Sequence, residues 1–350
     1  MNLSTRIAIP TLVRMKVGAL ARLGIYLSRF NHQRIAVLQS AELPADIVSI
    51  AKDSLARHDR TLTEWTDIDD HSFLHTIQRI TSLRGRPQAI VGLGGGKALD
   101  VAKYIAFLTK LPYFAVPTSL SNDGFSSPQS SLTVEGKRRS FAASMPFGVV
   151  VDTEVCLRAP KLLTLSGIGD LAAKFTAIHD WKLAFHHHGE SVDDFAALLS
   201  DGSVHAFMAR PNLDTDGIRL LATSLMLNGI AMEVCGSSRP ASGSEHLISH
   251  ALDEIASAPR LHGIQVGVAT YLVSLLQGLD VSAVDQLFES TGFWQAVYND
   301  PFPTDEWLRA VQLAPTIKPD FFTVLATRDV LPEVKTLLKS DPRLARCFKD

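Results

Sequence analysis

The first 150 residues alternate short apolar runs, rich in β-branched side chains, with longer segments of helical periodicity. This alternation predicts a parallel sheet whose strands are joined by crossover helices. The predicted strands span 34–39, 88–92, 113–116 and 148–151. Ligands on such sheets bind outside the carboxyl ends of the strands, so the segments that follow these strands are where functional residues are expected.

From about Leu162 onward the pattern changes to apolar residues at i, i+3 and i+4, which predicts helices. The expected helices span 171–185, 192–208, 216–234, 246–255, 265–276 and 332–338. One interruption of the first half, residues 131–134 and 140–143 joined across Glu135 to Lys137, has the pattern of a β-hairpin. We therefore expect an α/β domain over residues 1–161 and an all-helical domain over residues 162–350.

Composition narrows the class of ligand. The formal net charge is -2, with 46% hydrophobic and 20% charged residues. These values give no electrostatic reason to expect nucleic acid or an anionic membrane surface as a partner, so the predicted partner is a small molecule.

Three widely spaced cysteines suggest neither a disulfide framework nor a thiolate zinc site, and the first 14 residues lack the pattern of a signal peptide. Both features predict a cytoplasmic protein. The most apolar helical stretch, residues 220–234, is shorter than the roughly 20 residues that span a bilayer, and we interpret it as a buried core helix without membrane insertion.

A glycine-rich segment, Gly92 to Lys97, follows one predicted strand and opens a helix expected over residues 98–108. Glycines there allow backbone N–H groups to approach a pyrophosphate. The GxGxxG pattern fails at its third glycine, and the P-loop pattern fails because Ala98 follows Lys97. A tight turn that binds no ligand would use the same residues.

The segment 117–124 ends the next strand and presents the hydroxyls of Thr118, Ser119 and Ser121 together with Asn122 and Asp123. A plain turn has a similar composition, but this loop and the glycine loop are expected at the same edge of the sheet. No acidic residue ends the strand 34–39, so the sequence does not choose between NAD and NADP.

One carboxylate and three imidazoles suggest a metal site in the helical half. Asp170 is expected at the start of the helix 171–185, where it would also serve as an N-cap. His246 and His250 lie at i, i+4 on one helix face, and His262 follows after a short loop. An Asp with two His and an open fourth position is typical of a catalytic divalent site.

Several cationic residues are weaker candidates. Lys174 lies one turn after Asp170 and would either bind a phosphate or form an ion pair with that carboxylate. The run Lys137 to Arg139 would either bind a phosphate or form a solvated hairpin tip. The three histidines 186–188 are expected on the surface.

With these residues in view, the chain resembles the sn-glycerol-1-phosphate dehydrogenase family, within the superfamily of iron-containing alcohol dehydrogenases, glycerol dehydrogenase and dehydroquinate synthase. The similarity runs from about Arg34 to Thr270. The motifs that carry it, in order, are GLGGGKALDVAK (92–103), PTSLSNDGFSSP (117–128), SGIGDLAAK (166–174), SGSEHLISH (242–250) and LHG (261–263).

The resemblance implies a Rossmann-like first domain, a dehydroquinate synthase-like architecture, and roles for individual residues. Metal ligands would be Asp170, His246 and His262, while His250 and Asp123 would contact substrate. The residues implied in binding NAD or NADP are Gly94, Gly95, Gly96, Lys97, Asp100, Thr118, Ser121 and Ser127. The metal would be zinc, with iron or nickel also compatible with these ligands.

The implied reaction is reversible hydride transfer between the nicotinamide and C2 of dihydroxyacetone phosphate, with Asp170 among the catalytic groups and the metal acting as a Lewis acid. Alternatives are a dehydrogenase of glycerol or another free polyol, a non-redox cyclase of the dehydroquinate synthase type, and a nucleotide-binding regulator without catalysis. We also expect a homo-oligomer.

Overall fold

A six-stranded parallel sheet forms the amino-terminal half of the computed structural model, which describes residues 7–349. The strand order is β1-β8-β5-β4-β2-β3. The strands are β1 (Leu12–Lys16), β2 (Arg34–Ser40), β3 (Thr61–Ile68), β4 (Ala89–Gly94), β5 (Tyr113–Pro117) and β8 (Gly148–Asp152). The four predicted strands are confirmed. The signal-peptide expectation concerns residues 1–14, of which 1–6 lie outside the described part.

Helices cover both faces of this sheet. They are η1 (Leu20–Arg22), α1 (Leu23–Ser28), α2 (Ala45–Ala56), α3 (Phe73–Ser82), α4 (Gly96–Thr109) and α5 (Thr153–Leu157). Val91 of β4 packs in a core with α1 and α2, while its neighbour Ile90 packs in a core with α3 and α4. Alternate side chains point to opposite faces, so the strands need apolar residues at every position.

The two strands that the sequence did not predict are the edges of the sheet. β1 carries Arg14 and Lys16, and in β3 only Ile68 is buried. An edge strand buries less of its surface, so its polar residues hide the apolar signal that identifies the central strands.

The hairpin is confirmed as β6 (Gln129–Val134) and β7 (Lys137–Ala142), an antiparallel pair. Its turn is two residues long rather than three, because Lys137 already pairs with Val134. Glu135 and Gly136 both have positive φ, 51° and 77°, as a tight hairpin turn requires.

The rest of the described chain is helical apart from one pair of two-residue strands. The helices after α5 are α6 (Lys161–Ala172), α7 (Lys174–His188), α8 (Asp194–Met208), α9 (Thr215–Cys235), α10 (Ser244–Ile255), α11 (His262–Leu276), α12 (Ser282–Thr291), α13 (Phe293–Asn299), α14 (Thr304–Ile317), α15 (Leu331–Ser340) and α16 (Leu344–Cys347); shorter elements are η2 (Asp123–Ser126), η3 (Val324–Ala326), β9 (Phe302–Pro303) and β10 (Phe348–Lys349). The expected fold class is confirmed, and we propose the division of the chain at residue 161, in the first turn of α6.

One helix start was predicted wrongly. Asp170 lies inside α6, not at the beginning of a helix, and the expected helix 171–185 is the end of α6 followed by α7. The glycines Gly167 and Gly169 suggested a loop before Asp170. They belong instead to a helix, where they let neighbouring backbones approach closely.

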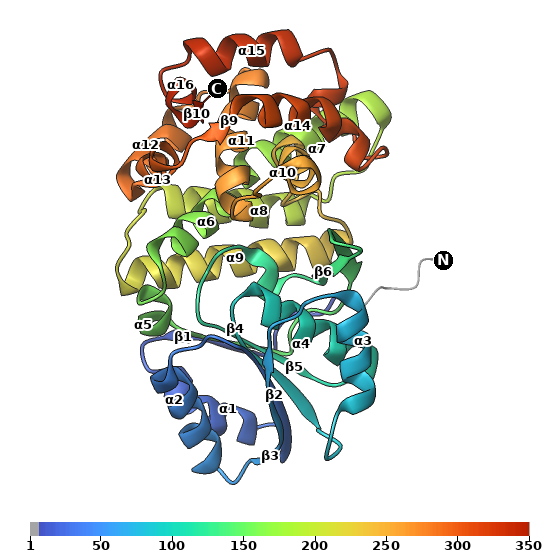
Figure 1. Ribbon diagram of the computed structural model, residues 1–350, viewed down its shortest axis with the longest axis vertical. Helices are drawn as coiled ribbons and strands as arrows, with labels where there is room; N and C mark the ends of the chain where they lie inside the picture. The colour runs from blue at the N-terminus through green and yellow to red at the C-terminus, as the bar shows by residue number, and fades with distance from the viewer. Residues whose placement is uncertain (1–6, 350) are drawn as a thin grey trace.

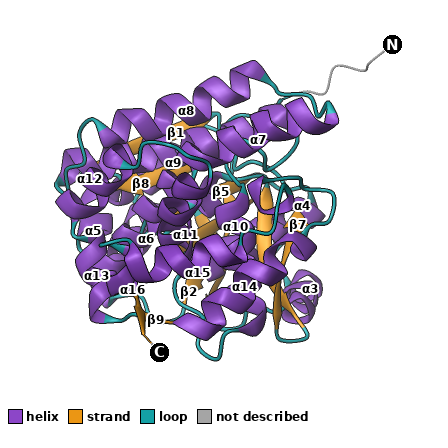
Figure 2. Ribbon diagram, turned by 90° about the horizontal axis from the view of Figure 1, so that it is seen from above, coloured by secondary structure: helices purple, strands orange, loops and turns teal. Residues whose placement is uncertain are grey.

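Helix α9 joins the two halves of the molecule. In Figure 1 it crosses the view between the sheet below and the helices α10 to α16 above, and Figure 2 shows helices lying in front of the strands. At 21 residues, with a mean hydropathy of 1.4 over its most apolar window, it is long and apolar enough to span a bilayer. It contacts α5, α6, α8, η2 and β1, which supports the interpretation as a core helix.

Candidate active site

The two loops expected to bind nucleotide lie side by side at the carboxyl edge of the sheet. Gly94, the last residue of β4, pairs with Pro117 of β5, and the Thr118 N–H donates to the Gly94 carbonyl at 3.0 Å. The parallel register of β4 and β5 brings both loops to one edge. Thr118 and Ser121 are each only half-buried there.

Gly94 and Gly96 of the glycine loop have different surroundings. Gly94 has φ +136°, and a Cβ on it would lie 2.2 Å from Oγ of Ser40, at the end of β2. Ser40 Oγ also accepts the Gly95 N–H at 3.0 Å. Around Gly96, at the start of α4, no atom lies within 4 Å of a built Cβ. The N-terminus of α4 is therefore open to an anionic ligand, with Lys97 exposed beside it.

Asp100 and Ser127 lie deeper in the site and are connected by a lysine. Lys103, with a wholly buried side chain, is 3.5 Å from both Asp100 Oδ1 and Ser127 Oγ. Its Nζ also donates to the carbonyls of Gly124 and Gln129, at 2.5 and 2.6 Å. Burial raises the pKa of Asp100, against the opposing charge of Lys103. Sequence reasoning gave no role to Lys103, although its i, i+3 spacing from Asp100 indicates an ion pair.

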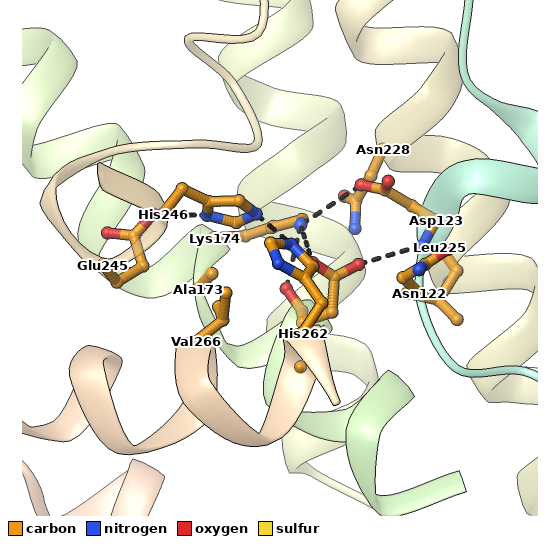
Figure 3. Close-up of polar contacts among 12 residues, drawn as sticks. Asn122, Asp123, Ala173, Lys174, Leu225, Asn228, Glu245, His246, His262 and Val266 are labelled. Atoms are coloured by element: carbon orange, nitrogen blue, oxygen red, sulfur yellow. Dashed lines mark hydrogen bonds and ion pairs between the residues drawn. The ribbon is translucent and has the colours of Figure 1, made fainter. Parts of the chain in front are cut away.

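The three residues expected to bind metal meet at one point. Asp170 Oδ1 lies 3.3 Å from His246 Nε2 and 3.8 Å from His262 Nε2, and one donor atom from each residue falls within 4.8 Å of the others. In Figure 3 the two imidazoles, from α10 and α11, lie beside Lys174 and the loop that carries Asp123. Ligand atoms of one tetrahedral ion lie about 3.3 to 3.6 Å apart, so this donor set needs only a small adjustment to hold a single divalent ion.

Close helix packing brings these residues together. A Cβ on Gly169 of α6 would lie 2.0 Å from the carbonyl oxygen of Gly263 of α11, and a Cβ on Gly263 would lie 1.7 Å from the Ser166 carbonyl. The Ser166 hydroxyl accepts the Gly263 N–H at 3.1 Å and donates to the Ser121 carbonyl at 2.8 Å. The metal-binding segments and the nucleotide loop are thus held together by one serine.

Each metal-directed imidazole has a partner on its other nitrogen. His246 Nδ1 lies 2.9 Å from Oε1 of the fully buried Glu245, and His262 Nδ1 lies 3.0 Å from the Ser249 hydroxyl. Such partners set the orientation and basicity of ligating histidines. Glu245 also accepts the Thr176 hydroxyl at 2.8 Å. Sequence reasoning missed this role for Glu245, because neighbours in sequence on a helix rarely contact each other.

Lys174 is the buried counter-ion of two carboxylates. Its Nζ lies 3.3 Å from Asp123 Oδ2 and 3.6 Å from Asp170 Oδ1, and its side chain is fully buried. Burial raises the pKa of Asp170, but Lys174 and His246 outweigh that effect and hold it well below its ordinary value. For Asp123, burial and the neighbouring Asp170 raise the pKa. The ion-pair interpretation of Lys174 is confirmed, and these two carboxylates compete with any phosphate for its charge.

His250 lies next to the metal-directed residues but is not one of them. Its ring stacks on that of His262, with centroids 5.7 Å apart. Burial, followed by the charges of His246 and Lys318, lowers the pKa of His250 well below its ordinary value, which keeps the imidazole neutral. A neutral imidazole both donates and accepts, as contact with a substrate hydroxyl requires.

Part of this site lines one cleft of about 700 Å³, a volume that includes space open to solvent. Its lining includes Asp100, Asp123, Ser127 and the three histidines 246, 250 and 262, together with two cations, Arg138 and Lys318. Two of the three metal-directed side chains and several polar groups expected to contact cofactor or substrate therefore share one cavity.

Comparison with known proteins identifies the class of enzyme that shares this fold. A sequence profile of iron-containing alcohol dehydrogenases matches residues 14–160. The fold is similar to glycerol dehydrogenase from Schizosaccharomyces pombe, at 18% identity and TM-score 0.76 over 97% of this chain and 90% of the other. A sulfoacetaldehyde reductase from Bifidobacterium kashiwanohense, in complex with NAD+, has TM-score 0.70 at 16% identity, covering 97% of this chain and all of the other. This is the fold of the iron-containing alcohol dehydrogenases.

Curated relatives narrow the class further. The glycerol-1-phosphate dehydrogenase [NAD(P)+] of Saccharolobus solfataricus is 37% identical over 246 residues, or 69% of this chain and 70% of the relative. The enzyme of that name from Metallosphaera sedula is 36% identical over the same shares. The chain belongs to the glycerol-1-phosphate dehydrogenase family and is an oxidoreductase.

Proposed function

We propose that this chain catalyses the reversible, NAD(P)-linked interconversion of dihydroxyacetone phosphate and sn-glycerol 1-phosphate. The observation that carries the proposal is the convergence of Asp170 with His246 and His262, two histidines that line a cleft together with Asp100, Asp123 and Ser127. The relatives at 36 to 37% identity are glycerol-1-phosphate dehydrogenases, which supports the same reaction.

The cofactor is proposed to lie along the carboxyl edge of the sheet. Its pyrophosphate would lie against Gly94, Gly95, Gly96 and Lys97, where the start of α4 presents N–H groups to an anion. Its nicotinamide half would reach Asp100, Thr118, Ser121 and Ser127. Ser40, not an acidic residue, ends β2, so the chain offers no carboxylate there to repel the phosphate of NADP.

The metal is proposed to be zinc, with iron or nickel as outcomes that the same ligands allow. Asp170, His246 and His262 would hold it, and Glu245 and Ser249 would orient the two imidazoles. When bound, the ion supplies a Lewis acid that polarises the substrate carbonyl.

The substrate is proposed to contact Asp123 and His250. Asp123 is held by Lys174 at 3.3 Å and would accept a hydrogen bond from one substrate hydroxyl. His250, kept neutral by its surroundings, would bond the C2 hydroxyl of sn-glycerol 1-phosphate and pass a proton between it and solvent. Asp123 and His250 would together hold the substrate carbon in a fixed position relative to the cofactor, which lowers the entropic cost of the reaction.

A direct test measures NAD(P)H oxidation with dihydroxyacetone phosphate before chelation, after chelation and after adding back zinc, iron or nickel. We expect activity to disappear on chelation and to return with the preferred ion. If the protein oxidises free glycerol in preference to sn-glycerol 1-phosphate, a polyol dehydrogenase is favoured instead. Absence of net cofactor turnover with a tightly held NAD would favour a cyclase.

We also propose that the protein acts in the cytoplasm as a homo-oligomer. All three cysteines are free, and Cys156 and Cys347 are buried, as suits a reducing compartment. Light scattering of the purified protein measures the oligomeric state.

A further inference from the structure

Lys318 is a cation of the cleft with no acidic partner. It follows α14 directly and lies in the segment after Thr270, where the sequence resemblance carries no motif. In the described part of the chain its ammonium forms no ion pair, and its one side-chain hydrogen bond is to Ser238 Oγ at a long 3.4 Å. The nearest aromatic contact is Phe321, 5.0 Å from Nζ to the ring centre.

Such an ammonium is costly for the folded protein, because its half-buried position removes part of its water without supplying a counter-ion. Burial and the charge of Arg239 lower the pKa of Lys318. Arg239 does not share this situation, since Glu190 Oε1 accepts from its Nε at 2.8 Å. The position of Lys318 therefore favours an anionic ligand that supplies the missing charge.

A second cation reaches the cleft from the other half of the molecule. Arg138 belongs to β7 of the hairpin, and its Nε donates to Ser131 Oγ at 2.5 Å. Its only carboxylate partner among the described residues is Asp253 Oδ2, at the limiting distance of 4.0 Å. Its side chain is 38% exposed. The guanidinium thus keeps N–H donors free for a ligand.

We infer that Lys318 and Arg138, with the hydroxyl of Ser238, hold the phosphate group of the substrate. This inference rests on the proposed function, since it places the carbonyl end of the substrate at Asp170, His246 and His262. Both cations line the same cleft as His246 and His262, so a substrate bound there has a cation for its phosphate as well as the metal-directed residues for its carbonyl end. A free polyol gains nothing from the two cations.

The cofactor phosphates are the alternative partners of these cations. Steady-state kinetics distinguishes binding of the substrate phosphate from binding of the cofactor phosphates. The variants are Lys318→Met, which keeps the length of the side chain without its charge, Lys318→Arg, which keeps the charge, and Arg138→Gln. Lys182→Met is the control, because Lys182 is an exposed residue of α7 that does not line the cleft. Each is measured for KM with dihydroxyacetone phosphate and with NADPH.

We expect Lys318→Met to raise KM for dihydroxyacetone phosphate by a factor on the order of 10 to 100, since the charged contact is equally present before and during the reaction. KM for NADPH should stay within about twofold of the wild-type value, and Lys318→Arg should recover most of the loss. Arg138→Gln should act in the same direction. Lys182→Met should leave both constants unchanged.

Calorimetric titration of inorganic phosphate into the metal-loaded protein gives a readout independent of turnover. Wild type should bind phosphate at least about tenfold more tightly than Lys318→Met. If Lys318→Met is folded by circular dichroism yet keeps both the KM for dihydroxyacetone phosphate and the phosphate affinity, the inference is overturned. A rise in KM for NADPH alone also overturns it.

An outcome that contradicts the proposed function differs from one that contradicts the phosphate site. A wild-type protein that binds metal but does not turn over dihydroxyacetone phosphate contradicts the proposed reaction. In that case the phosphate titration still decides whether Lys318 and Arg138 form an anion site. If Lys318→Met does not fold, Lys318→Arg and Arg138→Gln carry the comparison.

Discussion

Gly169 and Gly263 are in backbone contact where α6 crosses α11, and a Cβ on Gly169 would lie 2.0 Å from the Gly263 carbonyl oxygen. Asp170 follows the first glycine and His262 precedes the second. The distance between these two metal-directed side chains therefore depends on how closely the two helices approach. A side chain at either glycine would act on the metal site without touching a ligand.

Gly169→Ala should push α6 away from α11. We expect the free energy of unfolding to fall by about 1 to 3 kcal/mol and zinc affinity to fall with it, because the new methyl group has no space. Urea unfolding and competition with a chromogenic chelator measure the two effects. Gly202→Ala in α8 is the control, since nothing lies within 4 Å of its built Cβ. Equal metal affinity in both variants would contradict the packing argument.

Glu245→Gln should weaken metal binding while leaving the ligands in place. The carboxylate accepts from the Gly243 N–H and the Thr176 hydroxyl and lies 2.9 Å from His246 Nδ1. Removing its charge lowers the basicity of the imidazole, and we expect a 10- to 100-fold loss of zinc affinity, as for other outer-sphere partners. Glu154→Gln, at an exposed position of α5, should have no such effect. Unchanged zinc affinity in Glu245→Gln would contradict the role of Glu245 as the partner of His246.

Lys103→Met should loosen the loop that follows β5. It leaves a buried carboxylate, Asp100, and the carbonyls of Gly124 and Gln129 without their donor. We expect a loss of about 3 kcal/mol in the free energy of unfolding and a higher KM for the nicotinamide cofactor. Adding Asp100→Asn should restore part of the stability, because the unpaired charge is gone. A double-mutant cycle by urea unfolding checks this coupling.

Asp180 should make stability depend on pH. Burial and the nearby Glu245 raise its pKa to about 6, against hydrogen bonds from the Ser244 and Val324 N–H groups. The folded state therefore binds this proton more tightly than the unfolded chain does. Its stabilising effect is full below about pH 4 and is lost as the pH rises through about 6.

Asp180→Asn should remove this dependence. Between pH 4.5 and 7 we expect the free energy of unfolding of the wild type to fall by about 2 kcal/mol relative to that of the variant. Urea unfolding at several pH values measures it. Parallel profiles for the two proteins would show that Asp180 does not titrate in this range.

Much of the fold follows from local pattern. The central strands β2, β4, β5 and β8 are buried on both faces, so their uninterrupted apolar runs identify them. The edge strands β1 and β3 were missed because one side of each is polar. Helices α12, α13 and α14 were missed too, although α12 and α14 carry apolar residues at helical spacing that are buried in the core, such as Val284, Leu287 and Phe288 of α12.

The nucleotide loops were found because each lies in one continuous stretch after a central strand. The grouping of Asp170, His246 and His262 was also expected, but the choice of His262 over His250 came from the resemblance. The geometry agrees with that choice. The Nε2 atom of His262 lies 3.8 Å from Asp170 Oδ1, and His262, not His250, belongs to the group of possible metal ligands.

By itself, the sequence determined the central strands, the glycine-rich turn and the helical character of the second half, because these depend on neighbours a few residues apart. Tertiary structure alone decided that Asp170 lies within a helix, that Lys174 is enclosed by two carboxylates and that Arg138 and Lys318 face one cleft. Those relations depend on how closely backbones pack and on which charges are buried together. Neither quantity is encoded in the spacing of residues along the chain.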